Sequence, residues 1–279
     1  QHPPKYFLNH VLNVNLTSWN EQHEDEEPFA LDGLAQFQLK NRILNQTLQG
    51  QVVSQTSIAE GHLAYGEIGQ RQWNNIEAGI QPVLEQADLY IQESPLPPFE
   101  MHLLFKTQNV QLLGWQKQVV GDHLVMVLPN KLSAKILLPL IINMACLSAM
   151  GKRYKGVLIC MDHVITLQPM DQSSAFNYME QLVALFIQGQ SDPLAFMAET
   201  AWQLVRPNKQ GGRSYNNQLH SQNAFWGVSG QFGKAGERDD IHHQRCIDDL
   251  DDIPTTTLEL SETFFTPWIE LMEIVAHDV

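Results

Sequence analysis

The sequence predicts a mixed α/β fold in which helical regions precede and follow a central sheet. Apolar residues in the first hundred positions recur every three or four residues, those between 99 and 170 alternate or form short runs, and those after 171 return to helical spacing. With 43% apolar and 17% charged side chains among 279 residues, the chain has ample material for a buried core. We expect one domain with a helical region 1–98, a sheet region 99–170 and a helical region 171–279.

The first region is predicted to hold three helical segments. Pro3–Leu16 is short and amphipathic, and Asp32–Leu48 combines a plausible N-cap with an apolar stripe. The third segment, Gly66–Gln92, contains Gly79 and Pro82, two residues that disfavour the helix interior, so a break is expected there.

The second region carries the strands. Alternating residues before and after the turn at Gly121-Asp122 indicate a β-meander, and a helical pattern separates it from two further strands. The predicted strands are Phe99–Lys106, Val110–Val120, His123–Leu128, Gly156–Cys160 and Val164–Leu167, and the predicted helix is Ser133–Ala149.

The third region returns to helices and contains one loop rich in glycine, asparagine and glutamine, Arg206–Asn217. The predicted helices are Asp171–Ile187, Asp192–Leu204, Asp239–Leu250 and Leu258–Val275.

The net charge of −14 argues against a nucleic-acid partner, but the charges are segregated along the chain. Segments His123–Met161 and Thr200–Gly236 hold nine of the seventeen Lys and Arg residues and no acid. If the two segments converge, they form a basic face for DNA; otherwise their cations are ordinary surface residues. The candidates for DNA binding are Lys131, Lys135, Lys152, Arg153, Lys155, Arg213 and Lys234.

The three cysteines are far apart and form no Cys-x-x-Cys pair, which favours reduced core residues of a cytoplasmic protein over a disulfide or zinc site. No apolar run reaches the roughly 18 residues of a membrane span, so no membrane partner is expected.

Motifs in chain order resemble the C-terminal nuclease-like domain of RecC, the gamma subunit of exodeoxyribonuclease V. The resemblance begins with His-Pro-Pro-Lys-Tyr-Phe at His2 and is most specific in Glu-Pro-Phe-Ala-Leu-Asp-Gly-Leu, which ends at Leu34. Gly114-Trp115, Ala201-Trp202 and the run from Gly236 to Arg245 are also similar. The resemblance implies a PD-(D/E)XK nuclease-like core with flanking helices.

The same resemblance implies that the metal-binding positions of the nuclease are degenerate. Active relatives carry an aspartate in the meander, an acid two residues before a lysine, and a helical histidine. In this sequence Lys117 stands near the first position, Pro129 at the second, and Trp73 at the third, while Lys131 stands at the position of the lysine. A nuclease needs clustered carboxylates to hold Mg²⁺, so no catalytic residue and no bound metal are expected.

The expected function is therefore non-catalytic: guiding DNA and binding subunits within a RecBCD-type complex in double-strand break repair. The resemblance implies RecB and RecD subunits and duplex or unwound DNA as partners, with Mg²⁺ and ATP belonging to those subunits. The alternatives are a scaffold that never contacts DNA and, against the missing carboxylates, an active nuclease.

Three further groups of residues have two interpretations each. A helix starting at Asp239 places His243 and Cys246 on one face, which suggests a metal or simply a solvated acidic helix. Aromatic residues near Trp226 are expected to stack on bases or to pack internally. The candidates for a subunit interface on the last helix are Phe264, Phe265, Trp268 and Leu271.

Overall fold

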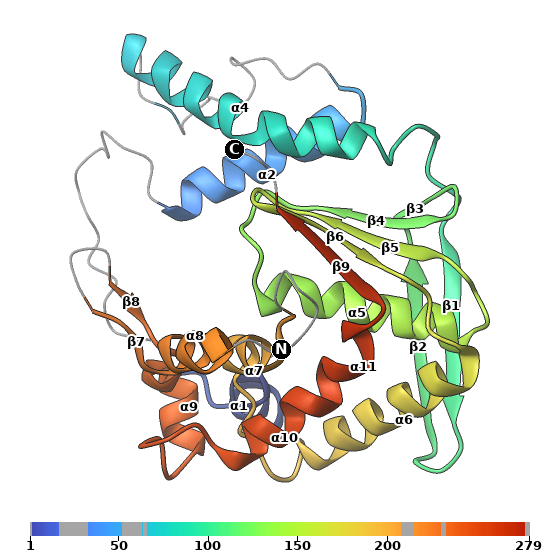
Figure 1. The fold of residues 1–279 in the computed structure, drawn as a ribbon, viewed down its shortest axis with the longest axis vertical. Coiled ribbons are helices and arrows are strands. Elements are labelled where there is room, and N and C mark those ends of the chain that lie inside the picture. The colour runs from blue at the N-terminus through green and yellow to red at the C-terminus, as the bar shows by residue number, and fades with distance from the viewer. Residues whose placement is uncertain are drawn as a thin grey trace.

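The computed structural model describes residues 2–16, 33–51, 63, 66–207, 215–229 and 233–276. In those ranges it confirms the mixed α/β fold: helices lie on both faces of a five-stranded sheet, and a separate two-stranded hairpin stands at one side (Figure 1). None of the helices in those ranges is long and apolar enough to span a membrane.

The elements follow one another in this order. The helices are α1 (Pro3–Tyr6), a π-helix (Phe7–Val11), α2 (Gly33–Leu48), α4 (Glu67–Asp88), α5 (Ala134–Ala149), α6 (Gln172–Gln188), α7 (Ala198–Val205), α8 (Tyr215–Trp226), a 3₁₀ helix (Glu237–Asp239), α9 (Ile241–Cys246), α10 (Thr255–Phe264) and α11 (Thr266–Ile269). The strands are β1 (Phe99–Phe105), β2 (Val110–Gln116), β3 (Val119–Val120), β4 (His123–Val127), β5 (Lys155–Ile159), β6 (His163–Leu167), β7 (Gly227–Val228), β8 (Lys234–Ala235) and β9 (Met272–Ala276).

The five-stranded sheet is mixed and has the order β3-β4-β5-β6-β9. Only β4 and β5 run parallel, because α5 carries the chain back along the sheet between them. Neighbouring residues of β5 point to opposite faces: Leu158 packs against the α5 side, whereas Val157 and Ile159 pack against α2 and α4. Helices cover both faces, and this explains why the strand is continuously apolar.

Helix α5 packs closely on the sheet. A Cβ atom at Gly156 of β5 would lie 2.8 Å from Cγ of Met144, so only glycine fits beneath this helix without movement. The backbone N–H of Ala134, at the start of α5, donates to Oε2 of Glu199 at 2.8 Å. Negative charge at a helix N-terminus is favourable, so this carboxylate helps to fix the start of α5.

The α7 helix is held in the same way by an acid from the C-terminal part of the chain. The two carboxylate oxygens of Glu237 accept the backbone N–H groups of Glu199 and Thr200 at 3.1 and 2.8 Å. Glu237 thus fixes α7, and Glu199 of α7 fixes α5. The two acids link the 3₁₀ helix to the centre of the core.

Two predictions about the first half of the chain were wrong. Helix α4 continues through Gly79 and Pro82, because Ile80 and Val83 on either side of the proline are buried and hold the helix in place. The strands before β4 do not form one meander. The β1–β2 hairpin is a sheet of its own, and only Val119 and Val120 pair with β4.

In the second half of the chain, the observed elements differ more from the predicted ones. The predicted helix Asp192–Leu204 starts only at Ala198, and Asp239–Leu250 forms only a 3₁₀ turn and the short α9. Helix α8 occupies part of the region expected to be a loop, although residues 208–214 and Asp32 lie outside the described ranges. The predicted helix Leu258–Val275 is wrong at its end: it gives way to α11 and then to β9, which pairs with β6.

Candidate functional site

Two of the three positions that the resemblance assigns to metal ligands, Lys117 and Pro129, lie at one end of the sheet. Pro129 and Lys131 follow β4 directly, and Pro129 is buried while Lys131 is exposed. The N–H of Val125 donates to the carbonyl of Gln118 at 2.9 Å, which extends the β3–β4 pairing by one residue towards Lys117. Lys117 and Pro129 therefore lie on neighbouring chain segments, and neither offers an oxygen ligand for Mg²⁺.

Trp73, the residue at the position of the helical histidine, belongs to a different part of the molecule. It lies on α4 in a buried cluster with Leu39 and Ile43 of α2. The α4 residues that pack on the sheet, Val83 and Ala87, come ten or more residues later, or about 15 Å along the helix. Trp73 serves as a packing residue between two helices.

The acids of the sheet region do not gather into a metal site. Glu100 is exposed on the outer side of β1, and Asp122 is exposed in the β3–β4 turn, where it lies 2.6 Å from Nδ1 of His123. Within the described ranges, the His, Cys, Asp and Glu side chains close enough together to hold an ion lie elsewhere in the fold.

Two acids near this end of the sheet escaped the sequence-based reasoning. Asp162, just after β5, accepts the backbone N–H of Leu132 at 2.8 Å, and Glu199 accepts that of Ala134. Both carboxylates hold backbone groups around the start of α5. Asp162 follows a predicted strand directly, so its position at the sheet end was recognisable, whereas Glu199 comes from a distant helix.

The candidate DNA-binding residues fall into two separate groups. The β4–β5 pairing starts at His123 and Lys155 and ends at Val127 and Ile159. Lys155, with Lys152 and Arg153 just before it, is therefore at one end of the parallel pair, and Lys131 at the other. Lys135 belongs with Lys131, because it begins α5 whereas Lys152 follows that helix.

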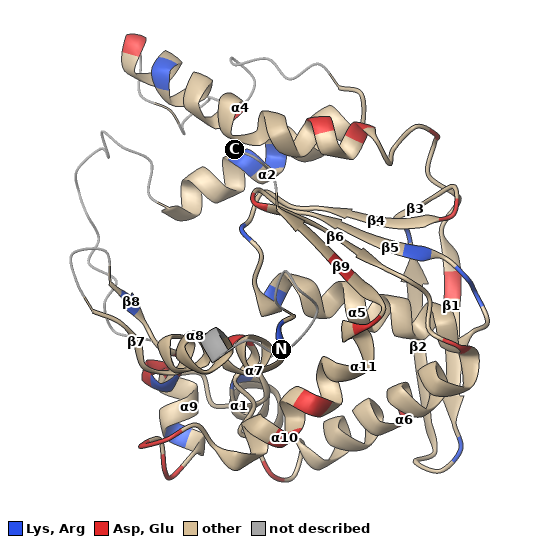
Figure 2. Ribbon diagram, in the orientation of Figure 1, with Lys and Arg blue, Asp and Glu red and all other residues tan. Residues whose placement is uncertain are grey.

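In the fold, the two segments that lack acids in the sequence lie next to acidic residues from other segments. Figure 2 shows basic residues at both ends of the sheet, with acidic residues among them. Lys234 is exposed on β8, in a different region, and Arg213 lies outside the described residues. Phe225 is fully buried, and half-exposed Trp226 carries Arg238 over its ring at 4.0 Å instead of offering a free face for a base.

Two of the four candidates for a subunit interface were wrong. Phe265 and Trp268 are fully buried, and the ring of Trp268 packs edge-on against Tyr178 at 5.9 Å between centroids. Phe264 is partly buried and stacks on Phe196, and Leu271 is partly buried beside β9. The apolar residues of this segment form core because they pack against Tyr178 of α6 and against Phe196.

The outer face of the β1–β2 hairpin is a better candidate for an interface. The inner residues of β1 pack into the core, but Leu104, Leu113 and Trp115 on the outer face are 43%, 61% and 63% exposed. Their register partners on the same face are polar or charged, with Glu100 directly opposite Trp115. Figure 1 shows α5 and α6 on one side of the hairpin only. Exposed apolar side chains gathered on one sheet face are typical of protein–protein interfaces.

A groove of about 1140 Å³ runs between β9 and α6, but its charges do not suit a phosphate chain. Arg206 lines it, and its guanidinium lies 3.5 Å from Nε2 of His163. Asp171, Glu270 and Glu273 line the same groove. Three acids against one arginine disfavour a polyanion there.

The comparisons with known proteins agree with the motifs in the sequence. The family model described as the RecC C-terminal domain matches residues 1–208. The chain is also 27% identical over 279 residues to the RecBCD enzyme subunit RecC of Escherichia coli (strain K12). That similarity covers 95% of this chain and 24% of the relative, so the chain spans about a quarter of the length of the curated protein it matches.

Proposed function

Since this chain belongs to the RecC C-terminal domain family, we propose that it is a non-catalytic, DNA-guiding and subunit-binding part of a RecC-type protein. The relative is a RecBCD enzyme subunit, and we extend that assignment to this chain. The chain then acts within a RecBCD-type helicase–nuclease, in double-strand break repair and homologous recombination in the bacterial cytoplasm. Mg²⁺ and ATP belong to the RecB-type and RecD-type subunits in this proposal.

One observation carries the non-catalytic part of the proposal: the end of the sheet offers Lys117 and Pro129 where a PD-(D/E)XK nuclease needs carboxylates, and only the lysine position, Lys131, is kept. The order β3, β4, α5, β5 supports a nuclease-like core, since its two hairpin strands are followed by a crossover helix and a parallel strand. Without ligands for a metal ion, the charge of the phosphate is not neutralised and the pKa of the attacking water is not lowered.

We expect the acids of the sheet region to be dispensable for DNA cleavage. The double variant Glu100→Gln/Asp122→Asn should leave the nuclease rate of the assembled complex within about twofold of the unchanged complex, because neither carboxylate belongs to a group of three potential metal ligands in the described residues. The chain alone should not cleave linear or single-stranded DNA with Mg²⁺ or Mn²⁺. Both substitutions are on exposed residues, so folding is not expected to change.

The same assay on Asp162→Asn is the more demanding test, because this carboxylate accepts the backbone N–H of Leu132, the residue after Lys131. Loss of cleavage by tenfold or more in any of these variants, with normal assembly and folding, would show that the chain takes part in the chemistry.

The DNA-guiding part of the proposal rests on the group Lys152, Arg153 and Lys155. All three are exposed, and they lie within four residues of one another beside the rings of Phe99 and Tyr154, which stack at 6.2 Å between centroids. Cations next to aromatic faces suit a nucleic-acid strand. Lys131 and Lys135, at the other end of the sheet, serve as the matched comparison.

We expect Lys152→Gln/Arg153→Gln to reduce the salt dependence of binding to forked DNA. Each phosphate contact contributes about 0.9 to the slope of log K against log salt, so losing two contacts should lower the slope by about 1.8. Lys131→Gln/Lys135→Gln should lower it by much less. The measurement is a salt titration of binding by the assembled complex, with subunit assembly verified for each variant.

The alternative is a scaffold that does not contact DNA, and the net charge of −14 favours it. Equal salt slopes for both pairs and for the unchanged complex would establish that alternative and remove the DNA-guiding role. A reduced slope for the Lys131/Lys135 pair alone would place the contact at the opposite end of the sheet.

A further inference from the structure

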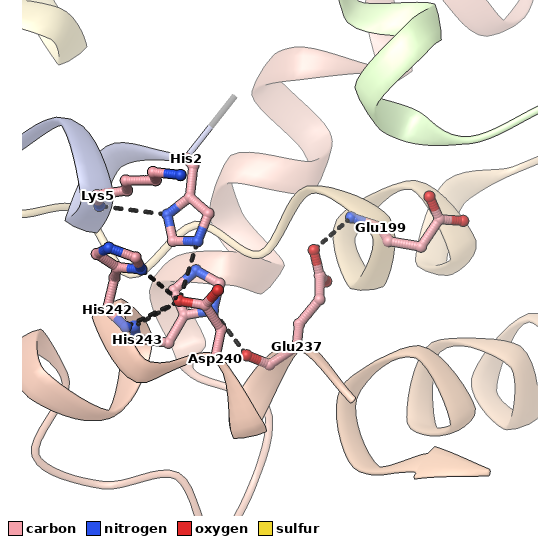
Figure 3. A network of polar contacts seen from close by, with 7 residues as sticks. All are labelled: His2, Lys5, Glu199, Glu237, Asp240, His242 and His243. Carbon is pink, nitrogen blue, oxygen red and sulfur yellow. Dashed lines mark hydrogen bonds and ion pairs between the residues drawn. The ribbon is translucent and has the colours of Figure 1, made fainter. Parts of the chain in front are cut away.

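Three side chains from opposite ends of the sequence meet where α1 packs on α9. Nε2 of His2 lies 3.2 Å from Oδ1 of Asp240, and Nδ1 of His242 lies 3.1 Å from the same oxygen. One ligand atom from each of the three residues lies within 4.8 Å of the other two. Figure 3 shows the two imidazole rings converging on the carboxylate.

Local helix geometry orients two of these side chains. His2 is the N-cap of α1, where Nδ1 accepts the N–H of Lys5 at 3.3 Å. Asp240 is the N-cap of α9, where Oδ1 accepts the N–H groups of His242 and His243 at 2.8 and 3.3 Å. The caps therefore hold the ligand atoms in position before any ion binds.

Burial and neighbouring charges shift the pKa values of two of these groups. Burial, together with His243, lowers the pKa of His2 to about 4, against the opposing effect of Asp240. Burial would raise the pKa of Asp240, but the N–H of His242 and the neighbouring His2 hold it below its usual value.

One buried ring nitrogen beside the cluster, Nε2 of His243, has no hydrogen-bond partner. Nε2 of His2 is buried as well, and its near neighbour is the Asp240 carboxylate at 3.2 Å. The His243 ring is 2% exposed, stacks on His2 at 4.3 Å, and has Nδ1 2.7 Å from the carbonyl of Glu237. Buried nitrogen atoms without partners are costly unless they serve a ligand.

We propose that His2, Asp240 and His242 bind a divalent transition-metal ion of the zinc class. Ligands about 2.0–2.1 Å from a tetrahedral ion lie about 3.3 Å from one another, close to the two distances observed here. Two imidazoles and one carboxylate suit zinc and its neighbours in the first transition series. A fourth position remains for water. When the ion binds at Nε2, the proton of His2 moves to Nδ1, which can then no longer accept the N–H of Lys5. The loss of this hydrogen bond lowers the affinity for the ion.

The ion would fasten α1 to α9, two segments separated by more than two hundred residues. The helix spacing in the sequence pointed to Asp239, His243 and Cys246 instead. Among the described residues, these three side chains do not form a group that could hold an ion; Asp240 and His242 form one with His2. No spacing rule includes His2, because the fold alone brings it there.

The test is a titration of the metal-free 279-residue chain with Co²⁺, whose visible absorption reports tetrahedral coordination, followed by competition with Zn²⁺. We expect one saturable site per chain. His242→Gln and His2→Gln should each weaken it by at least tenfold, on the order of the loss expected for a ligand. His220→Gln, on an exposed residue of α8, should leave the affinity unchanged.

Circular dichroism of each variant verifies folding, so a lost site is distinguished from a lost fold. Two results would overturn the proposal: no tetrahedral Co²⁺ spectrum in the unchanged chain, or equal affinity in the unchanged, His2→Gln and His242→Gln proteins. Neither result bears on the DNA-guiding role.

Discussion

Replacing Trp268 by alanine should lower the free energy of unfolding by about 3–5 kcal/mol, the range for removing a large aromatic side chain from a core. Its side chain is fully buried beneath Tyr178, whose hydroxyl donates to the carbonyl of Phe264 at 2.9 Å. The cavity left by the ring would disturb the junction of α6, α10 and α11. Urea unfolding of the chain, followed by circular dichroism, gives the measurement.

A conservative variant separates volume from polarity at this position. The indole N–H of Trp268 makes no hydrogen bond of good geometry, so Trp268→Phe removes a poorly paired donor while keeping most of the apolar volume. Trp268→Phe should lower the free energy of unfolding by much less than Trp268→Ala does. If Trp268→Ala costs less than about 1 kcal/mol, the side chain is not part of a packed core, and its assignment to a subunit interface regains support.

Trp115 should show the opposite behaviour. Trp115→Ala is expected to change the free energy of unfolding by no more than about 0.5 kcal/mol, because its ring is largely exposed on the β1–β2 hairpin. We expect it to weaken assembly with a partner subunit by about 30-fold, which corresponds to the 2 kcal/mol typical of a central aromatic residue in an interface. Assembly with the proposed RecB-type and RecD-type partner subunits can be followed by analytical ultracentrifugation.

The control for this prediction is Leu219→Ala, since Leu219 is 57% exposed on α8, away from the hairpin. A similar loss in both variants would point to general disturbance. No loss for Trp115→Ala, even when combined with Leu113→Ala, would exclude the outer face of the hairpin as the docking surface.

The sequence predicted the elements whose signals are local. Strands β5 and β6 and helix α6 were recognisable because short apolar runs and the N-cap Asp171 lie within the elements themselves. Strand β9 was not, because the partner that makes Met272–Ala276 a strand is β6, more than a hundred residues earlier. Its apolar residues continue the spacing of the preceding helix closely enough to extend the helical prediction.

The site was less predictable because chain order and position in space diverge. The crossover through α5 places Lys131 and Lys155 at opposite ends of the sheet, although both belong to one acid-free segment. Conversely, Glu199 accepts a backbone N–H at the start of α5, and Glu237 accepts one at the start of α7. Each acid comes from a distant segment, so the sequence around the helix start did not predict the contact. That Lys117 and Pro129 are not acids can be read from the sequence alone, and their assignment to metal-ligand positions rests on the resemblance.

The pairing of β9 with β6 also has a consequence for synthesis on the ribosome. Strand β6 ends at Leu167 and its partner begins at Met272, so roughly a hundred further residues must be translated before the two strands can meet. At about 5–20 residues per second, the nascent chain displays the bare edge of β6 for about 5–20 seconds. An unpaired strand edge recruits other extended chains, so this interval is when the nascent protein most needs a chaperone.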